Sequence, residues 1–209
     1  FIGSGVWRPR SLGVKGESFG NCHFAVDYLQ NPDVYQLGDR VAVIGSGNSA
    51  MDVARTAIRK GSRYVTVYAR HDEVSASQRE FEYAQADGVE FEYFKGVDSI
   101  TAKGPMMTEL HYDEAGKLIR EDAPTLFEAD STIIAVSQRP KDKIVRTTTG
   151  IETNNKGLVE VDETGATTRE GVFSGGDVVL GPWNVVQAVK DAKKVADTMD
   201  AYLTKKRKS

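Results

Sequence analysis

The Gly-x-Gly-x-x-Ala motif at residues 45–50 has the residue types and spacing that bind the pyrophosphate of a dinucleotide. Gly45 permits a tight turn, Gly47 lets a phosphate approach the backbone, and Ala50 packs the following helix closely against the strand. The N–H groups at the start of that helix would then hold the phosphate oxygens. The apolar run Val41–Ile44 leads directly into the motif, and this context strengthens a pattern that is weak alone. The predicted contacts are Gly45, Ser46, Gly47, Asn48, Ser49 and Ala50.

The residues after the motif predict the elements that must position it. An apolar stripe at helical spacing follows, formed by Ala50, Val53, Ala54, Ala57 and Ile58. Gly61 ends this helix, and the apolar-rich run Tyr64–Tyr68 predicts a second strand. A strand, a helix and another strand in this order indicate an α/β fold with a parallel sheet of the Rossmann type.

The end of the second strand carries a cation, Arg70, where NAD-binding chains usually have an acid. A guanidinium offers a planar fork of donors that fits the 2′-phosphate of NADPH, and His71 adds a further donor. We expect Arg63 or Arg79 to lie nearby. The acidic pair Asp72–Glu73 could bind a ribose hydroxyl, so NADH remains the alternative nucleotide. The alternative interpretation of Arg70 is a solvated loop residue with no ligand. The sequence predicts NADPH as the nucleotide.

Composition and charge exclude several classes of protein. The chain has 209 residues and a net charge of −3, which gives no electrostatic reason to expect a nucleic-acid partner. No apolar run reaches the length of a membrane span, so we expect no membrane partner and a cytoplasmic location. Cys22 is the single cysteine and the three histidines are scattered, so we expect neither a redox cysteine pair nor a metal site within this chain. The absence of an initiator methionine or a signal peptide suggests a fragment.

Further along the chain the pattern changes twice. Short runs between residues 100 and 120, separated by turn residues, predict an antiparallel crossover within the α/β domain. The buried strand predicted at 131–136 then leads into Ser137 and Gln138, at the carboxyl edge where open α/β sheets bind ligands. The run Gly171–Val179 contains a Gly-Gly-Asp sequence, and a long helix is predicted after it.

The combined motifs resemble a known family. The segments 45–50, 68–70, 134–140 and 173–179 occur in the order and spacing of flavoproteins with two dinucleotide domains, of the pyridine nucleotide-disulfide reductase type. Within that superfamily the chain most resembles the glutamate synthase small (β) subunit and its relatives. The run Ser49-Ala50-Met51-Asp52-Val53-Ala54-Arg55-Thr56-Ala57 is similar to that subgroup's S/T-A-M-D-x-x-R-T-A helix.

The resemblance implies an FAD domain that is interrupted by an inserted NADPH domain. It places the end of the first FAD segment at residues 1–37, the NADPH domain at 38–145 and the last FAD segment at 146–209. By position, Asp177 matches an acid that bonds the ribityl chain of the flavin. Asn184 and Val185 match the start of a helix whose dipole favours charge on the reduced flavin. The flavin-side residues implied by the resemblance are Gly3, Gly5, Gly176, Asp177, Asn184 and Val185.

Three features of this chain depart from the family pattern. The family's first Gly-x-Gly-x-x-Gly motif, which binds FAD, is absent, and so is the Cys-rich amino-terminal region that holds iron–sulfur clusters. Ser137 stands where glycine is usual. The first two differences imply that the FAD site is incomplete in this chain.

The resemblance implies hydride transfer from NADPH to FAD, with electrons passing onward to an iron–sulfur partner or larger catalytic subunit. The cofactors supply this chemistry while the protein supplies orientation and electrostatics, so we nominate no catalytic side chain. A non-catalytic nucleotide-binding or scaffolding module of the Rossmann type is the alternative, since fold does not determine function. An NAD-linked disulfide reductase is disfavoured because the chain lacks a cysteine pair.

Overall fold

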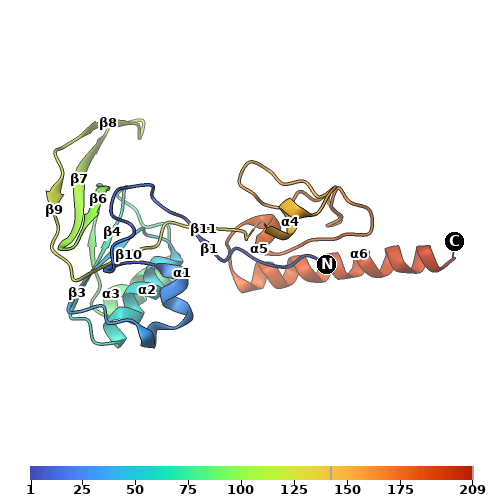
Figure 1. The fold of residues 1–209 in the computed structure, drawn as a ribbon, viewed down its shortest axis with the longest axis horizontal. Coiled ribbons are helices and arrows are strands. Elements are labelled where there is room, and N and C mark those ends of the chain that lie inside the picture. The colour runs from blue at the N-terminus through green and yellow to red at the C-terminus, as the bar shows by residue number, and fades with distance from the viewer. Residues whose placement is uncertain (142, 209) are drawn as a thin grey trace. The chain divides into compact units, whose positions relative to one another are not determined.

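The structure is a computed structural model that describes residues 1–141 and 143–208. These residues form two compact units (Figure 1): a sheet unit, Pro9–Ser137, and a long-helix unit, Phe1–Arg8 with Gln138–Ser209. The domain boundaries expected after residues 37 and 145 do not coincide with these limits, because residues 9–37 pack within the sheet unit. The assignment of segments to an NADPH domain and an FAD domain stays a prediction.

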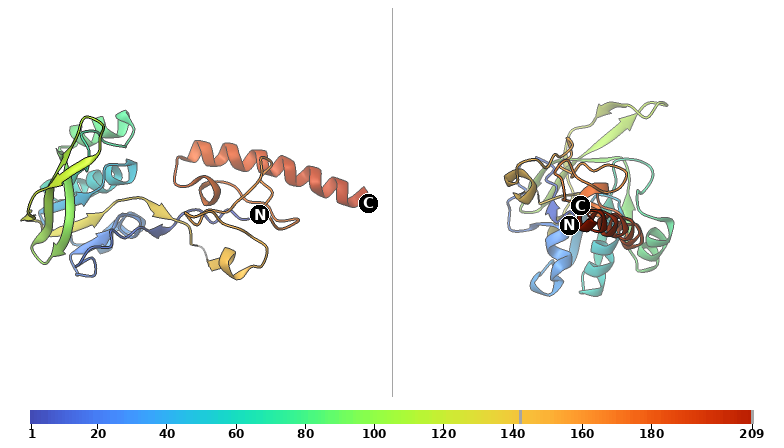
Figure 2. Two further views of the ribbon diagram at one scale, coloured as in Figure 1. Left: turned by 90° about the horizontal axis from the view of Figure 1, so that it is seen from above. Right: turned by 90° about the vertical axis from the view of Figure 1, so that its right-hand side faces the viewer.

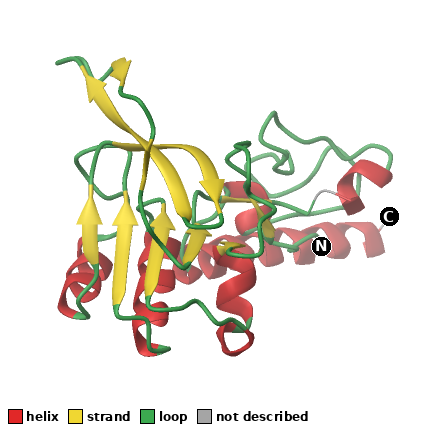
Figure 3. Cartoon of the chain, turned by 60° about the vertical axis from the view of Figure 1, so that its left-hand side comes forward, coloured by secondary structure: helices red, strands yellow, loops and turns green. Residues whose placement is uncertain are grey.

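The sheet unit is built on a five-stranded parallel sheet with the strand order β2-β10-β3-β4-β5. Figure 3 shows the strands side by side, with helices packed against them. In that order the strands are β2 (Cys22–Phe24), β10 (Ser131–Ile134), β3 (Arg40–Ile44), β4 (Tyr64–Tyr68) and β5 (Glu90–Glu92). All of the pairings are parallel, as predicted for an α/β fold of this type.

The helices of the sheet unit connect these strands and bury their apolar faces. Helix α2 (Asn48–Arg59) joins β3 to β4, and α3 (Gln78–Ala86) joins β4 to β5. Helix α1 (Ala25–Gln30) follows β2, and a short 3-10 helix, η1 (Pro32–Val34), follows α1. The apolar stripe predicted for α2 is confirmed at Ala50, Val53, Ala54 and Ala57, which are buried, while Ile58 is only partly buried. Met51, which was not predicted, is buried as well.

Antiparallel strands between β5 and β10 confirm the predicted crossover. They are β6 (Lys95–Thr101), β7 (Gly104–Tyr112), β8 (Leu118–Glu121) and β9 (Thr125–Leu126), and β7 pairs with the other three. One apolar cluster joins this layer to the parallel sheet, and it contains Ala42, Ile44, Tyr68, Met107 and Ala129. The crossover therefore covers one face of the sheet.

The long-helix unit has little regular structure apart from its helices. The short strands at its limits in the sequence are β1 (Arg8–Pro9), whose second residue already belongs to the sheet unit, and β11 (Gln138–Arg139). The helices are α4 (Lys143–Thr147), α5 (Asp177–Leu180) and α6 (Val185–Lys208), and Figure 2 shows α6 as one long helix. None of the helices among the described residues has the length and hydropathy that crossing a bilayer requires.

The core of the sheet unit yields a stability prediction. Ile133 is 0% exposed in the interior strand β10, so Ile133→Ala leaves a cavity and is expected to lower the free energy of unfolding by about 2–5 kcal/mol. The matched control is Ile119→Ala in β8, where the side chain is 63% exposed and a change within about 0.5 kcal/mol is expected. Urea unfolding followed by circular dichroism measures both. Equal losses in the two variants would contradict the burial of Ile133 in the interior of the sheet.

Candidate functional site

Gly45 lies at a close backbone contact where β3 ends. Its φ of 119° is in a region that favours glycine, and an added Cβ would lie 2.5 Å from the carbonyl oxygen of Ala135. Gly47 then precedes α2, and no side chain caps the amino end of that helix. Ala50 is fully buried beneath the strand. The turn therefore leaves helix N–H groups available for the oxygens of a pyrophosphate.

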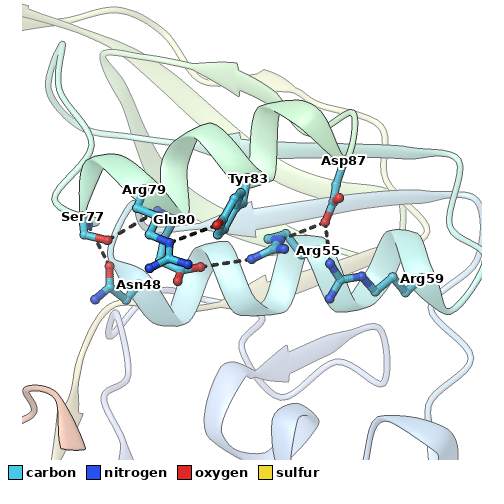
Figure 4. A network of polar contacts seen from close by, with 8 residues as sticks. All are labelled: Asn48, Arg55, Arg59, Ser77, Arg79, Glu80, Tyr83 and Asp87. Atoms are coloured by element: carbon cyan, nitrogen blue, oxygen red, sulfur yellow. Dashed lines mark hydrogen bonds and ion pairs between the residues drawn. The ribbon is translucent and has the colours of Figure 1, made fainter. Parts of the chain in front are cut away.

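The side chains of Ser46 and Asn48 bind protein rather than pointing to free space. Asn48 Oδ1 accepts a hydrogen bond of 2.8 Å from the Ser77 N–H (Figure 4). Ser46 Oγ accepts from the Ser75 N–H at 3.4 Å, and the Ser46 carbonyl accepts from the Ala76 N–H at 2.9 Å. The oxygen acceptors of both side chains are thus used within the protein, and the predicted cofactor contacts of Ser46 and Asn48 stay a prediction.

The sequence did not predict that the segment Ser75–Ser77 contacts the glycine turn. A local signal for it exists, because Ser77 and Glu80 have the Ser-x-x-Glu spacing of a helix capping box. In the structure the Ser77 hydroxyl accepts from the Glu80 N–H at 3.4 Å at the start of α3. That signal predicts the helix start, but only the fold shows that this start lies against the glycine turn.

Arg70 is exposed immediately after β4. The preceding residue, Ala69, is held by two backbone hydrogen bonds: its N–H donates to Glu92 and its carbonyl accepts from Lys95, at 2.8 and 2.9 Å. Arg70 itself makes no hydrogen bond or ion pair with any described residue. The His71 ring lies 5.0 Å from the Tyr112 ring, measured between centroids. A guanidinium without a protein partner is free to bind a phosphate.

The expectation that Arg63 lies near Arg70 is wrong. The two residues flank the five-residue strand β4, so they are roughly 20 Å apart at about 3.3 Å per residue. Arg63 instead pairs with Asp39 at 3.6 Å. Arg79 lies on α3, where its Nε donates to the Tyr83 hydroxyl at 3.0 Å.

Polar contacts attach α3 to α2. Arg55 donates to Glu80 at 3.1 Å and to Asp87 at 2.8 Å, and Arg59 donates to Asp87 at 2.9 Å. The hydrogen bond from Arg55 is the main cause that lowers the pKa of Asp87. Figure 4 shows these contacts in a row along the two helices, with Asn48 and Ser77 at the opposite end from Arg59.

Ser137 follows β10 with a φ of 76°, a left-handed conformation that glycine adopts most readily. The backbone here thus has the geometry of the glycine that the family pattern carries at this position. Ser137 is exposed, and its carbonyl accepts from the Arg10 N–H at 3.4 Å. Gln138, the next residue, belongs to the long-helix unit.

The long-helix unit contains a pocket of about 360 Å³ that brings together most of the expected flavin-side residues. Next to the lining residue Gly175, the Ile2 carbonyl accepts hydrogen bonds from the Ser174 hydroxyl at 2.9 Å and from the Gly175 N–H at 3.3 Å, which joins the two ends of the unit in the sequence. Asn184 and Val185 do not line this pocket, and Asn184 instead accepts from the Gln187 N–H at 2.9 Å at the start of α6. The lining residues are Phe1, Gly3, Gly5, Val6, Trp7, Gln138, Gly175, Gly176, Asp177, Ala188 and Ala192.

Asp177 is the acidic group of this pocket. Burial raises the pKa of Asp177, and the Trp183 backbone N–H opposes that shift. Gly176, with a φ of 75°, precedes α5 and donates its N–H to Asp191 at 2.6 Å. This turn places Asp177 in the wall, where its carboxylate is suited to accept hydroxyl hydrogen bonds.

Within the described part of the chain, no group of three or more His, Cys, Asp or Glu side chains is placed to hold a metal ion. Cys22 is buried, and burial is the main cause that raises the pKa of its thiol to about 11. A thiol that stays protonated at neutral pH is a poor nucleophile.

The family model for pyridine nucleotide-disulphide oxidoreductases matches residues 1–192. The chain belongs to this family. The name of the family is that of oxidoreductases acting with a pyridine nucleotide, in agreement with the enzyme class expected from the sequence. Solved relatives confirm the fold: a thioredoxin reductase of T. acidophilum matches with a TM-score of 0.74 and 23% identity, covering 97% of this chain and 65% of that one.

Curated relatives of this family member include subunits of larger enzymes. The glutamate synthase [NADPH] small chain of Halomonas elongata is 34% identical over 97% of this chain and 49% of its own length. The NADP(+)-dependent formate dehydrogenase subunit beta of Moorella thermoacetica is 32% identical over 97% of this chain and 31% of its own length. The chain thus spans about half the length of the glutamate synthase small chain, and less of the second relative.

The left-handed backbone at Ser137 predicts a stabilising substitution. This conformation costs a residue other than glycine about 1–3 kcal/mol, which a glycine here would avoid. Glycine also has more conformational freedom in the unfolded chain, which reduces the expected gain in stability by about 0.4–1 kcal/mol. Ser137→Gly is therefore expected to raise the free energy of unfolding by about 1 kcal/mol, measured by urea titration. Ser18→Gly is the control, because Ser18 is exposed and its φ is not positive. Stabilisation of both variants would show that the effect is unrelated to φ.

The pocket acid gives a pH prediction. The pKa of Asp177 is raised in the folded chain, so the ionised carboxylate is less favourable there than in the unfolded chain. The wild-type chain therefore loses stability as the pH rises through that pKa. Asp177→Asn removes this penalty. Its stability advantage is expected to be absent below about pH 4 and present at pH 7. Thermal unfolding across this range measures the difference, and Asp197→Asn on the exposed side of α6 is the control. An advantage that does not change with pH would contradict the assignment.

Proposed function

We propose that this chain is the NADPH-binding part of a flavin oxidoreductase similar to the glutamate synthase small subunit. The observation that carries the proposal is the combination of an uncapped amino end of α2, bounded by Gly45 and Gly47, with an unpaired guanidinium at the end of the next strand. The helix start suits the pyrophosphate that NADH and NADPH share, and the cation suits the 2′-phosphate that only NADPH carries.

In this proposal the backbone N–H groups at the start of α2 bind the pyrophosphate, and Arg70 binds the 2′-phosphate. The pocket of the long-helix unit contributes to holding FAD, with Asp177 accepting hydrogen bonds from hydroxyl groups and glycines leaving room for the cofactor. The cofactors supply the chemistry, which is hydride transfer from a nicotinamide to a flavin. The residues of this chain bind and orient them, and none of them has to act as an acid or a base.

Electrons are proposed to pass onward to an iron–sulfur partner or a larger catalytic subunit. The names of two relatives support this, since one is a small chain of glutamate synthase and the other a subunit of formate dehydrogenase. Both names also carry NADPH or NADP(+), in agreement with the cation at Arg70. A free, buried Cys22 fits a reducing compartment, so the proposal includes a cytoplasmic location.

The nucleotide assignment is tested by calorimetric titration with NADPH and, separately, with NADH. Arg70→Ala is expected to weaken NADPH binding by about 1.5–3 kcal/mol, the range of a hydrogen bond to a charged group, and to leave NADH binding nearly unchanged. Arg63→Ala is the matched control, because Arg63 lies at the other end of β4. Equal weakening of both nucleotides by Arg70→Ala would overturn the assignment to the 2′-phosphate.

A further inference from the structure

The side chain of Asn48 fixes one end of the loop that carries Arg70. Three successive N–H groups, those of Ser75, Ala76 and Ser77, donate to the glycine turn. The bond from Ser77 to Asn48 Oδ1 is the shortest of the three at 2.8 Å, while the bond from Ser75 to the Ser46 hydroxyl is 3.4 Å. Asn48 therefore supplies the main side-chain attachment at this end.

The other end of the loop is held by the sheet. The backbone hydrogen bonds of Ala69 to Glu92 and from Lys95 continue the pairing of β4 beyond its last residue. Between these two attachments, residues 70–74 make no hydrogen bond with any described residue. Within this exposed loop the ring of His71 lies 5.0 Å from that of Tyr112, so the position of Arg70 depends on this contact and on the two attached ends.

Helix α3 has its own attachments and does not depend on Asn48. Arg55 and Arg59 bind Glu80 and Asp87 farther along the two helices. Figure 4 places Asn48 with Ser77 at one end of this row of contacts and Arg59 with Asp87 at the other. Removal of the Asn48 amide leaves the backbone bond from Ala76 to Ser46 and the contacts of α3 in place, so it is expected to loosen the loop end while α3 stays on α2.

We propose that Asn48 is a positioning residue that gives the site its preference for NADPH over NADH. It acts through the loop that carries Arg70, without itself touching the 2′-phosphate, and the proposal rests on the function proposed above. A guanidinium held in place loses less conformational freedom on binding than one on a more loosely attached loop. The advantage applies only to the nucleotide that has a 2′-phosphate. A change in the glycine turn itself affects both nucleotides equally and cancels in the ratio of their dissociation constants.

The test is the ratio of the dissociation constants for NADH and NADPH, measured by calorimetric titration of the full chain. Asn48→Ala is expected to lower this ratio about fivefold to tenfold, the equivalent of one hydrogen bond. Arg59→Ala is the matched control: it removes another contact between α2 and α3, at the far end, and is expected to leave the ratio unchanged. Thermal unfolding of each variant shows whether the fold is retained.

Two further variants separate positioning from general damage. In an Arg70→Ala background the substitution of Asn48 is expected to have no additional effect on the ratio, because the loop then carries no cation to position. Asn48→Asp keeps an acceptor oxygen for the Ser77 N–H and is expected to retain the preference. The added negative charge near the pyrophosphate weakens both nucleotides alike.

The outcomes distinguish this inference from the proposed function. A wild-type preference for NADPH that survives Asn48→Ala overturns the inference and leaves the proposed function intact. Independent, additive effects of Asn48→Ala and Arg70→Ala on the ratio also overturn it. A wild-type chain that binds NADH as well as NADPH, or that binds neither, overturns the proposed nucleotide function and the inference together.

Discussion

The close approach of Gly45 to the carbonyl of Ala135 is the constraint on which the nucleotide site depends. Its N–H donates to the Tyr68 carbonyl at 3.1 Å, so the end of β3 stays tied to β4 while the chain turns away from the sheet. A side chain at this position would collide with the end of β10 at 2.5 Å. Because the turn is this tight, α2 begins three residues beyond Gly45 and its amino end lies next to the carboxyl edge of the sheet. The site exists where three strands end together.

Apolar burial holds α2 on the sheet, and polar contacts orient α3 along α2. The buried face of α2 packs on the sheet, and such burial supplies most of the stabilisation of the fold. The ion pairs of Arg55 and Arg59 are partly exposed, so each contributes little free energy by itself. Their geometry nevertheless fixes how α3 lies along α2. That register brings Ser77 to Asn48 and closes the loop after β4.

The long-helix unit has a small apolar core and an open pocket. Its core is small, with Val145, Val159 and Val178 as the buried residues of its apolar cluster. Its pocket is lined largely by glycines, small apolar side chains and aromatic rings, together with one carboxylate whose ionisation is disfavoured by burial. Such a wall suits a site that accommodates a ligand better than it suits a packed core.

The sequence by itself determined the βαβ unit, the apolar face of α2 and the antiparallel crossover, because these follow from local periodicity and from glycine positions. It also indicated the family, since several motifs recur in a fixed order. Only the tertiary structure decided that Ser46 and Asn48 hold residues 75–77, and that Arg63 lies at the far end of β4 from Arg70. It also brought Ile2 to Ser174, which the chain separates by 172 positions. Local patterns specify which element a residue joins, whereas contacts between distant segments depend on how those elements pack.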